Sequence, residues 1–235
     1  MEETKKNIVI VGYPKSGTTW MSKLVAELFS CPLKGNWGFK TDNDPMGEGY
    51  DRISSYDCYK SHHTYEEIYN VDKKNIYKII YILRDPRDIV ISGLYFFNFF
   101  KKSALINKYL PKAFKKKQMI KAVLFGNKKL NQWCELSWKN HHKGYLNKDI
   151  LFVKYEDLLQ NSKLECQRIL KYLNIEKTDE FILNAIEKQS FKNVKKSNNI
   201  RKGEIEYWKD QLSGSENQLF IKHLGSSLDY FGYKI

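Results

Sequence analysis

The chain has 235 residues, of which 42% are hydrophobic and 29% are charged. These proportions are ordinary for a globular protein, and no apolar run approaches the roughly 20 residues that a membrane-spanning helix needs. Forty basic against 27 acidic residues give a net charge of +13, which favours a polyanionic partner such as a nucleotide, a nucleic acid or an acidic membrane surface.

Short apolar runs that are each followed by a helical pattern indicate the core of the chain. The first run, IVIV at 8–11, is rich in β-branched residues and precedes a helical pattern at 19–29. Two further runs have the same arrangement. They occupy 78–83 and 150–153, and the helical patterns that follow them cover 85–97 and 155–173.

The segments between these units carry weaker patterns. Residues 103–146 read as mostly helical, and the glycine-rich stretch 34–56 reads as an irregular loop. Continuous apolar strands that alternate with helices predict an α/β fold with a central parallel sheet covered by helices on both faces. No repeat or linker divides the sequence, so we expect one domain over residues 1–235.

The pattern of the four cysteines and the length of the N-terminal apolar run indicate in which cellular compartment the protein is expected. Cys31, Cys58, Cys134 and Cys166 are scattered and form no CxxC pair, which argues against a zinc site or a disulfide framework. The apolar run at 8–11 is too short for the core of a signal peptide. We therefore expect reduced thiols, a cytoplasmic location and no metal.

The sequence GYPKSGTTW at 12–20 follows the first expected strand and opens the first expected helix. Its small residues allow successive backbone N–H groups to face one concavity at a helix N-terminus, where an anion is favoured. In the loop of nucleoside-triphosphate enzymes a lysine follows the second glycine, whereas here Thr18 does. A kinase also needs carboxylates that hold Mg²⁺. Transfer of a singly charged sulfuryl group, in contrast, needs less charge neutralisation and can proceed without a metal. The residues expected to bind a phosphate-like group are Lys15, Ser16, Gly17, Thr18 and Thr19.

This string, PKSGTTW at 14–20, resembles the 5′-phosphosulfate loop of sulfotransferases that use 3′-phosphoadenosine 5′-phosphosulfate (PAPS), especially the cytosolic type. The segment YILRDPRDIVIS at 81–92 is similar to the family's 3′-phosphate segment, and the similarity implies that Arg84 and Ser92 bind that phosphate. Taken alone, the run RDPRD is also typical of a helix cap with surface ion pairs.

Three further elements extend the resemblance: RKGEIEYWK at 201–209, LFVKYEDL at 151–158 and SFK at 190–192. RKGEIEYWK at 201–209 is similar to a C-terminal RKGxxGDWK element, which implies a second hold on the 3′-phosphate, but Glu206 and Tyr207 replace its glycine and aspartate. Glycine adopts a positive φ readily, so its replacement by Glu206 calls into question whether the backbone makes the same turn here. The remaining residues implied to lie at the nucleotide are Trp20, Tyr155, Ser190, Phe191, Arg201, Lys202 and Gly203.

Removal of a proton from the acceptor needs a base, and histidine suits this task because its pKa lies near neutrality. CYKSH at 58–62 resembles the family's KTH element, which implies that His62 is the base and that Lys60 and Lys15 stabilise charge on the transferred group. Spacing alone does not separate His62 from His63. Glu48 or Asp51 is an alternative, because glycan-type members use a carboxylate. We expect His141 and His142 to be exposed beside Lys139 and Lys143.

The resemblance therefore implies an enzyme of EC 2.8.2 type that transfers the sulfuryl group of PAPS in line to a hydroxyl or amine and leaves 3′-phosphoadenosine 5′-phosphate (PAP). The acceptor class stays open among small molecules, lipids and glycans. The basic amphipathic stretch 109–121 is more typical of a solvated helix face than of a surface that contacts an anionic membrane or an acidic acceptor. The alternatives are a small-molecule kinase, a nucleic-acid-binding protein and a PAPS-binding relative without activity. No nucleic-acid-binding motif is visible, so we expect no specific nucleic acid partner.

Overall fold

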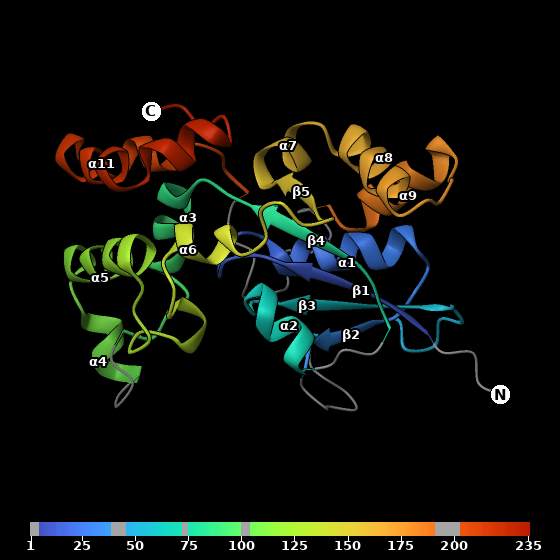
Figure 1. The fold of residues 1–235 in the computed structure, drawn as a ribbon. Coiled ribbons are helices and arrows are strands. Elements are labelled where there is room, and N and C mark those ends of the chain that lie inside the picture. Colours follow the sequence, from blue (N-terminus) through green and yellow to red (C-terminus); the bar gives the residue numbers. More distant parts are fainter. Residues whose placement is uncertain (1–4, 39–45, 72–74, 100–103, 191–202) are drawn as a thin grey trace. The chain divides into compact units, whose positions relative to one another are not determined.

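The computed structural model describes residues 5–38, 46–71, 75–99, 104–190 and 203–235 (Figure 1). The chain forms two compact units. The sheet unit comprises Met1–Gly12, Gly17–Leu83 and Gly144–Gly203, and the helical unit comprises Tyr13–Ser16, Arg84–Lys143 and Glu204–Ile235. One domain over residues 1–235 stays a prediction.

The sheet unit is built on five strands in the order β2-β3-β1-β4-β5, and every neighbouring pair is parallel. This arrangement confirms the expected α/β fold with a parallel sheet flanked by helices. The strands are β1 (Lys6–Val11), β2 (Leu33–Asn36), β3 (Tyr56–Ser61), β4 (Ile76–Leu83) and β5 (Leu151–Lys154). The helices in the described part of this unit are α1 (Thr18–Leu28), α2 (Tyr65–Val71), α7 (Tyr155–Gln160), α8 (Ser162–Tyr172) and α9 (Asp179–Lys188).

One face of the sheet carries the main hydrophobic core. Alternate residues of a strand point to the same face, so Ile8 and Ile10 of β1 join Ile80 and Ile82 of β4 in one fully buried cluster with residues of α1, α8 and α9. Figure 1 shows these three helices along that face. On the other face, the indole N–H of Trp37 donates to the carbonyl of Ile68 in α2 at 3.0 Å.

The helical unit contains α3 (Pro86–Gly93), α4 (Ala104–Tyr109), α5 (Lys112–Phe125), α6 (Trp138–Lys143) and α11 (Gly214–Tyr230). This unit also contains two short 3-10 helices, η1 (Gln132–Cys134) and η2 (Tyr207–Asp210). Helix α3 is shorter than the pattern at 85–97 predicts. Within the described ranges, no helix combines the length and the apolarity that a bilayer crossing requires.

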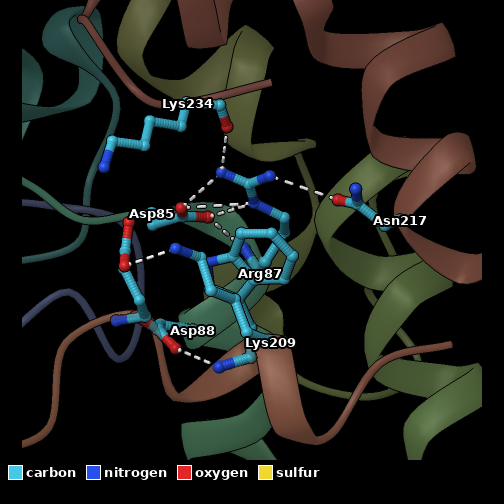
Figure 2. Close-up of polar contacts among 8 residues, drawn as sticks. Asp85, Arg87, Asp88, Lys209, Asn217 and Lys234 are labelled. Atoms are coloured by element: carbon cyan, nitrogen blue, oxygen red, sulfur yellow. Dashed lines mark hydrogen bonds and ion pairs between the residues drawn. The ribbon is translucent and has the colours of Figure 1, made fainter. Parts of the chain in front are cut away.

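A buried ion pair between Arg87 and Asp85 lies within the helical unit (Figure 2). The guanidinium of Arg87 is 1% exposed, and its Nε and Nη2 donate to the two carboxylate oxygens of Asp85 at 2.9 and 2.7 Å. It also donates to Asn217 Oδ1 at 3.1 Å and to the carbonyl of Lys234 at 2.7 Å, and it lies over the ring of Trp208. Arg87 therefore joins α3 to η2, α11 and the C-terminal residues.

Asp85 has a second role, because its carboxylate also accepts the backbone N–H of Arg87 and caps α3. The run RDPRD thus does form a helix cap, as its composition alone indicates. The ion pair it contributes is buried rather than on the surface.

The expected exposure of His141 and His142 is wrong, because each is 2% exposed. The two rings lie on the buried side of α6: His141 contacts Tyr13, and His142 contacts the rings of Trp138 and Phe231. Nδ1 of His142 is buried without a hydrogen-bond partner in the part of the chain that the structure describes. Burial, together with the charges of the nearby His141 and Lys139, lowers the pKa of His142 to about 4.

This buried histidine predicts an acid-sensitive contribution to stability. The folded-state pKa of His142 lies below its ordinary value of 6.5, so the unfolded chain takes up a proton that the folded chain does not as pH falls from 6.5 to 4. At pH 4.5 the loss amounts to about 2 kcal/mol. The free energy of unfolding of His142→Leu minus that of wild type is therefore expected to be about 2 kcal/mol larger at pH 4.5 than at pH 7.

Urea denaturation of both proteins at the two pH values measures this difference. Burial raises the pKa of Asp88 to about 6, which stabilises the folded chain as pH falls and opposes the effect of His142. Both proteins contain Asp88, so its contribution cancels when their free energies of unfolding are subtracted. It does not cancel in the pH dependence of wild type measured alone. An equal free-energy difference between the two proteins at both pH values would contradict the prediction.

All four cysteines are free and buried. Burial raises the pKa of Cys31, Cys134 and Cys166 to about 12, and it raises the pKa of Cys58 well above its ordinary value. The thiols are reduced, as expected, and at neutral pH they are protonated.

Candidate functional site

In the sheet unit, β1 and β3 end side by side, because Val11 pairs with Ser61. Gly12 and His62 are the next residues of the two strands, and Nδ1 of His62 lies 2.7 Å from the carbonyl oxygen of Gly12. A carbonyl oxygen only accepts hydrogen bonds, so Nδ1 carries the proton and donates it. In the neutral ring the basic nitrogen is then Nε2.

His63 has a different environment. The Ser61 hydroxyl accepts the backbone N–H of His63 at 3.1 Å and lies 2.9 Å from Nδ1 of the same residue. Burial lowers the pKa of His63. The carbonyl of His63 accepts the hydroxyl of Tyr145 at 2.6 Å. His63 is thus tied to its own strand end and to Tyr145, whereas His62 contacts the first residue of the phosphate loop.

Gly17 opens helix α1 and needs to be glycine for two reasons. Its φ is +98°, and a Cβ atom at this position would lie 2.6 Å from the ring of Tyr155. Gly17 is the N-cap of α1 and supplies no side-chain cap. Backbone N–H groups in the first turn of a helix lack intrahelical partners, so the start of α1, at Thr18 and Thr19, suits an anion.

The other loop residues, at 13–16, belong to the helical unit. Lys15 has a left-handed backbone with φ +73°, and its ammonium lies 3.6 Å from the centroid of the Phe96 ring. The Ser16 hydroxyl is fully buried and has no hydrogen-bond partner in the described part of the chain. Such a group costs free energy unless a ligand or water satisfies it, so this loop fits the phosphate-like group that the sequence predicts.

Arg84 follows β4 in the chain and holds two backbone segments of the helical unit. Its Nη1 donates to the carbonyl of Lys15 at 3.2 Å, and its Nη2 donates to the carbonyl of Glu204 at 3.4 Å. Ser92 lies in α3 about two turns further on and is half-buried. The structure therefore brings Arg84 to the phosphate loop and to the residue after Gly203.

Glu206 stands where the family pattern has a glycine, yet the backbone keeps the conformation that a glycine would favour. Glu206 keeps a left-handed backbone, with φ +57° and ψ +17°, although it is not a glycine. This conformation costs a residue with a side chain roughly 1–2 kcal/mol. The carboxylate of Asp88 accepts the backbone N–H groups of Glu206 and Trp208, each at 2.9 Å, and so holds the turn.

Of the aromatic residues implied to lie at the nucleotide, the structure describes Trp20 and Tyr155 but not Phe191. Trp20 is buried, its indole N–H donates to the carbonyl of Gln189 at 2.9 Å, and its ring meets the ring of Tyr155 edge-on. Ser190 follows Gln189, and its buried hydroxyl has no partner among the described residues. Phe191, Arg201 and Lys202 lie outside the described residues, and Gly203 has φ +66°.

The alternative carboxylates differ in their surroundings. Glu48 forms an ion pair of 2.6 Å with Lys23, and its backbone bridges to Leu33. Asp51 is exposed. Lys60, in contrast, lies in β3 two residues before His62 and is half-buried. Within the described ranges, no group of three or more histidine, cysteine, aspartate or glutamate side chains is placed to hold a metal ion.

The role of Asp88 and the contact between Lys15 and Phe96 were not predicted from the sequence. A carboxylate in the first turn of the expected helix, four residues after Arg84, was the signal available for Asp88. Its partners are backbone groups more than 100 residues away, which composition does not reveal.

Known proteins resemble this chain in sequence and in fold. A family model described as Sulfotransferase domain matches residues 5–232. Sulfotransferase 1E1 of Bos taurus is 25% identical in an alignment of length 265, which covers 94% of this chain and 83% of the relative. Sulfotransferase 1B1 of Canis lupus familiaris is 27% identical in an alignment of length 250, which covers 91% of this chain and 80% of the relative.

Among solved structures, mouse sulfotransferase SULT7A1 complexed with PAP is similar in fold, with a TM-score of 0.71 at 20% identity. The similarity covers 95% of this chain and 84% of the mouse protein. Together with the family match over almost the whole chain, the ordered motifs show that this chain belongs to the PAPS-dependent sulfotransferase family.

Proposed function

We propose that the chain transfers the sulfuryl group of PAPS to a hydroxyl or amine of an acceptor, with His62 as general base. The observation that carries this proposal is the hydrogen bond from His62 Nδ1 to the carbonyl of Gly12. It supports His62 as the base because it holds the ring beside the first residue of the phosphate loop. It also leaves Nε2 as the nitrogen that accepts a proton.

The residues present suit a nucleotide with phosphate groups at both ends. Lys15, the unpartnered Ser16 hydroxyl and the start of α1 would hold the 5′ end. Arg84, Ser92 and the segment that begins at Arg201 would hold the 3′-phosphate. PAPS, when bound, supplies a sulfuryl group on a phosphate leaving group.

The protein's own groups then account for the proton and the charge. His62 Nε2 takes the proton of the acceptor O–H or N–H as the acceptor atom bonds to sulfur in line with the departing phosphate oxygen. The ammonium groups of Lys15 and Lys60 stabilise the negative charge that develops on the transferred and leaving groups. Acceptors of this class would be small molecules, lipids or glycans, and the protein would act in the cytoplasm.

Ligand-dependent thermal unfolding tests the class of nucleotide. We expect PAP to stabilise the protein more than AMP, and more than ATP with Mg²⁺, because PAP alone carries a phosphate at each end of adenosine. A ligand at about 100 times its Kd adds roughly 2.7 kcal/mol. Arg84→Ala should remove most of the stabilisation by PAP. Lys128→Ala, which removes a positive charge at an exposed site of the same unit, should leave it unchanged.

Selective stabilisation by ATP with Mg²⁺ would contradict the proposal and favour a small-molecule kinase. Transfer of label from PAPS to members of an acceptor panel then identifies the acceptor.

A further inference from the structure

Both oxygens of a buried carboxylate hold one turn of backbone in the helical unit. Asp88 lies in the first turn of α3 and is 2% exposed. Its Oδ2 accepts the N–H of Glu206 and its Oδ1 accepts the N–H of Trp208, each at 2.9 Å. Charge-assisted bonds of this kind to two N–H groups fix the direction of the chain as well as its distance from α3.

The turn that Asp88 holds adopts a conformation that its own sequence disfavours. Glu206 has a left-handed backbone that glycine adopts readily and glutamate does not. Such a conformation persists where surrounding contacts determine it. Here those contacts come from α3, because Asp88 binds the N–H groups at 206 and 208 and Arg87 lies 3.7 Å from the ring of Trp208.

Arg84 acts on the same turn. Its Nη2 donates to the carbonyl of Glu204, and its charge lowers the pKa of Asp88 against the larger effect of burial, which raises it. Asp88 and Arg84 therefore hold the backbone of residues 204–208 from one side. In the sequence this segment follows directly on Arg201, Lys202 and Gly203, which the family resemblance assigns to the 3′-phosphate.

We propose that Asp88 is a positioning residue for the 3′-phosphate of the nucleotide: it fixes the turn at 204–208, to which Arg84 donates a hydrogen bond, in the geometry that lets Arg84 bind that phosphate. This inference rests on the proposed function. Asp88 touches neither the nucleotide nor the acceptor and acts through the backbone of residues 204–208. Its removal weakens the recognition of the 3′ end and leaves the recognition of the 5′ end intact.

The test compares PAP with AMP, which lacks the 3′-phosphate. In Asp88→Asn one acceptor oxygen remains, and the amide group leaves one of the two N–H groups without an acceptor. We expect the Kd of PAP, measured by titration calorimetry, to rise at least 10-fold and the Kd of AMP to change less than 2-fold. A loss of general stability would weaken both ligands alike. An unchanged ratio of the two Kd values would overturn the proposal.

A matched pair of variants at Glu206 tests the turn without altering the buried carboxylate. Glu206→Gly and Glu206→Val both remove the exposed ion pair with Lys209, but only valine resists the left-handed backbone. We expect the glycine variant to keep the wild-type preference for PAP over AMP and the valine variant to lose it at least 10-fold. Equal preferences in the two variants would overturn the proposal even if Asp88→Asn fails to fold.

The wild-type protein separates this inference from the function on which it rests. If wild type prefers PAP to AMP and the variants do so equally, only the role of Asp88 is wrong. If wild type itself shows no preference for PAP, the proposed function is wrong.

Discussion

Replacement of His62 by alanine is expected to reduce sulfuryl transfer by about 10²–10⁴-fold, the usual contribution of a positioned general base. PAP should still bind within 2-fold of wild type, because the groups assigned to its phosphates do not include the imidazole. Initial rates with labelled PAPS and titration calorimetry with PAP measure the two quantities.

Two further variants separate the base from the orientation of the side chain. In His62→Asn the amide N–H can replace Nδ1–H as the donor to Gly12, but no basic nitrogen remains, so this variant should be as inactive as His62→Ala. In His63→Ala transfer should stay within a few-fold of wild type, because His63 contacts Ser61 and Tyr145. Full activity in His62→Ala would move the role to His63 or to a carboxylate.

Removal of the Asp85 carboxylate is expected to cost the most stability of any single change considered. In Asp85→Ala the guanidinium of Arg87 stays buried without its counterion, and breaking a buried pair in this way costs about 3–5 kcal/mol. Loss of the cap of α3 adds about 1 kcal/mol. Urea denaturation followed by circular dichroism gives the free energy of unfolding.

An exposed pair in the same unit is the control. Lys128 and Glu135 form an ion pair of 2.8 Å with side chains 69% and 54% exposed, so Glu135→Ala should cost less than about 1 kcal/mol. The double variant with Asp85→Ala and Arg87→Met should recover part of the loss, because no buried charge then remains uncompensated. Equal costs for Asp85→Ala and Glu135→Ala would show that Arg87 finds another partner or reaches water.

Three strands could be predicted from the sequence and two could not. The strands β1, β4 and β5 contain continuous apolar runs, which a doubly covered parallel sheet requires. In contrast, β2 and β3 read LKGN and YDCYKS, and their lysine, asparagine and aspartate interrupt the apolar pattern. The helix expected over 155–173 is divided at Asn161, whose φ of −130° leaves the helical region.

The histidine pair shows where a pattern was present but misread. Trp138, His141 and His142 are spaced i, i+3 and i+4, which places them on one face of α6, while Lys139 and Lys143 share the other face. The neighbouring lysines suggested solvent, whereas the spacing indicates a buried stripe. At the site, local strings predicted the phosphate loop, but the contact between His62 and Gly12 depends on the register of β3 against β1.

The four buried thiols also make the protein convenient for site-specific labelling. Reaction with maleimides and similar reagents needs a thiolate, and burial keeps all four cysteines protonated and out of reach. One cysteine introduced at an exposed position such as Ser215 would therefore be the dominant nucleophile towards these reagents. A fluorophore or spin label could then report on nucleotide binding without first replacing the native cysteines.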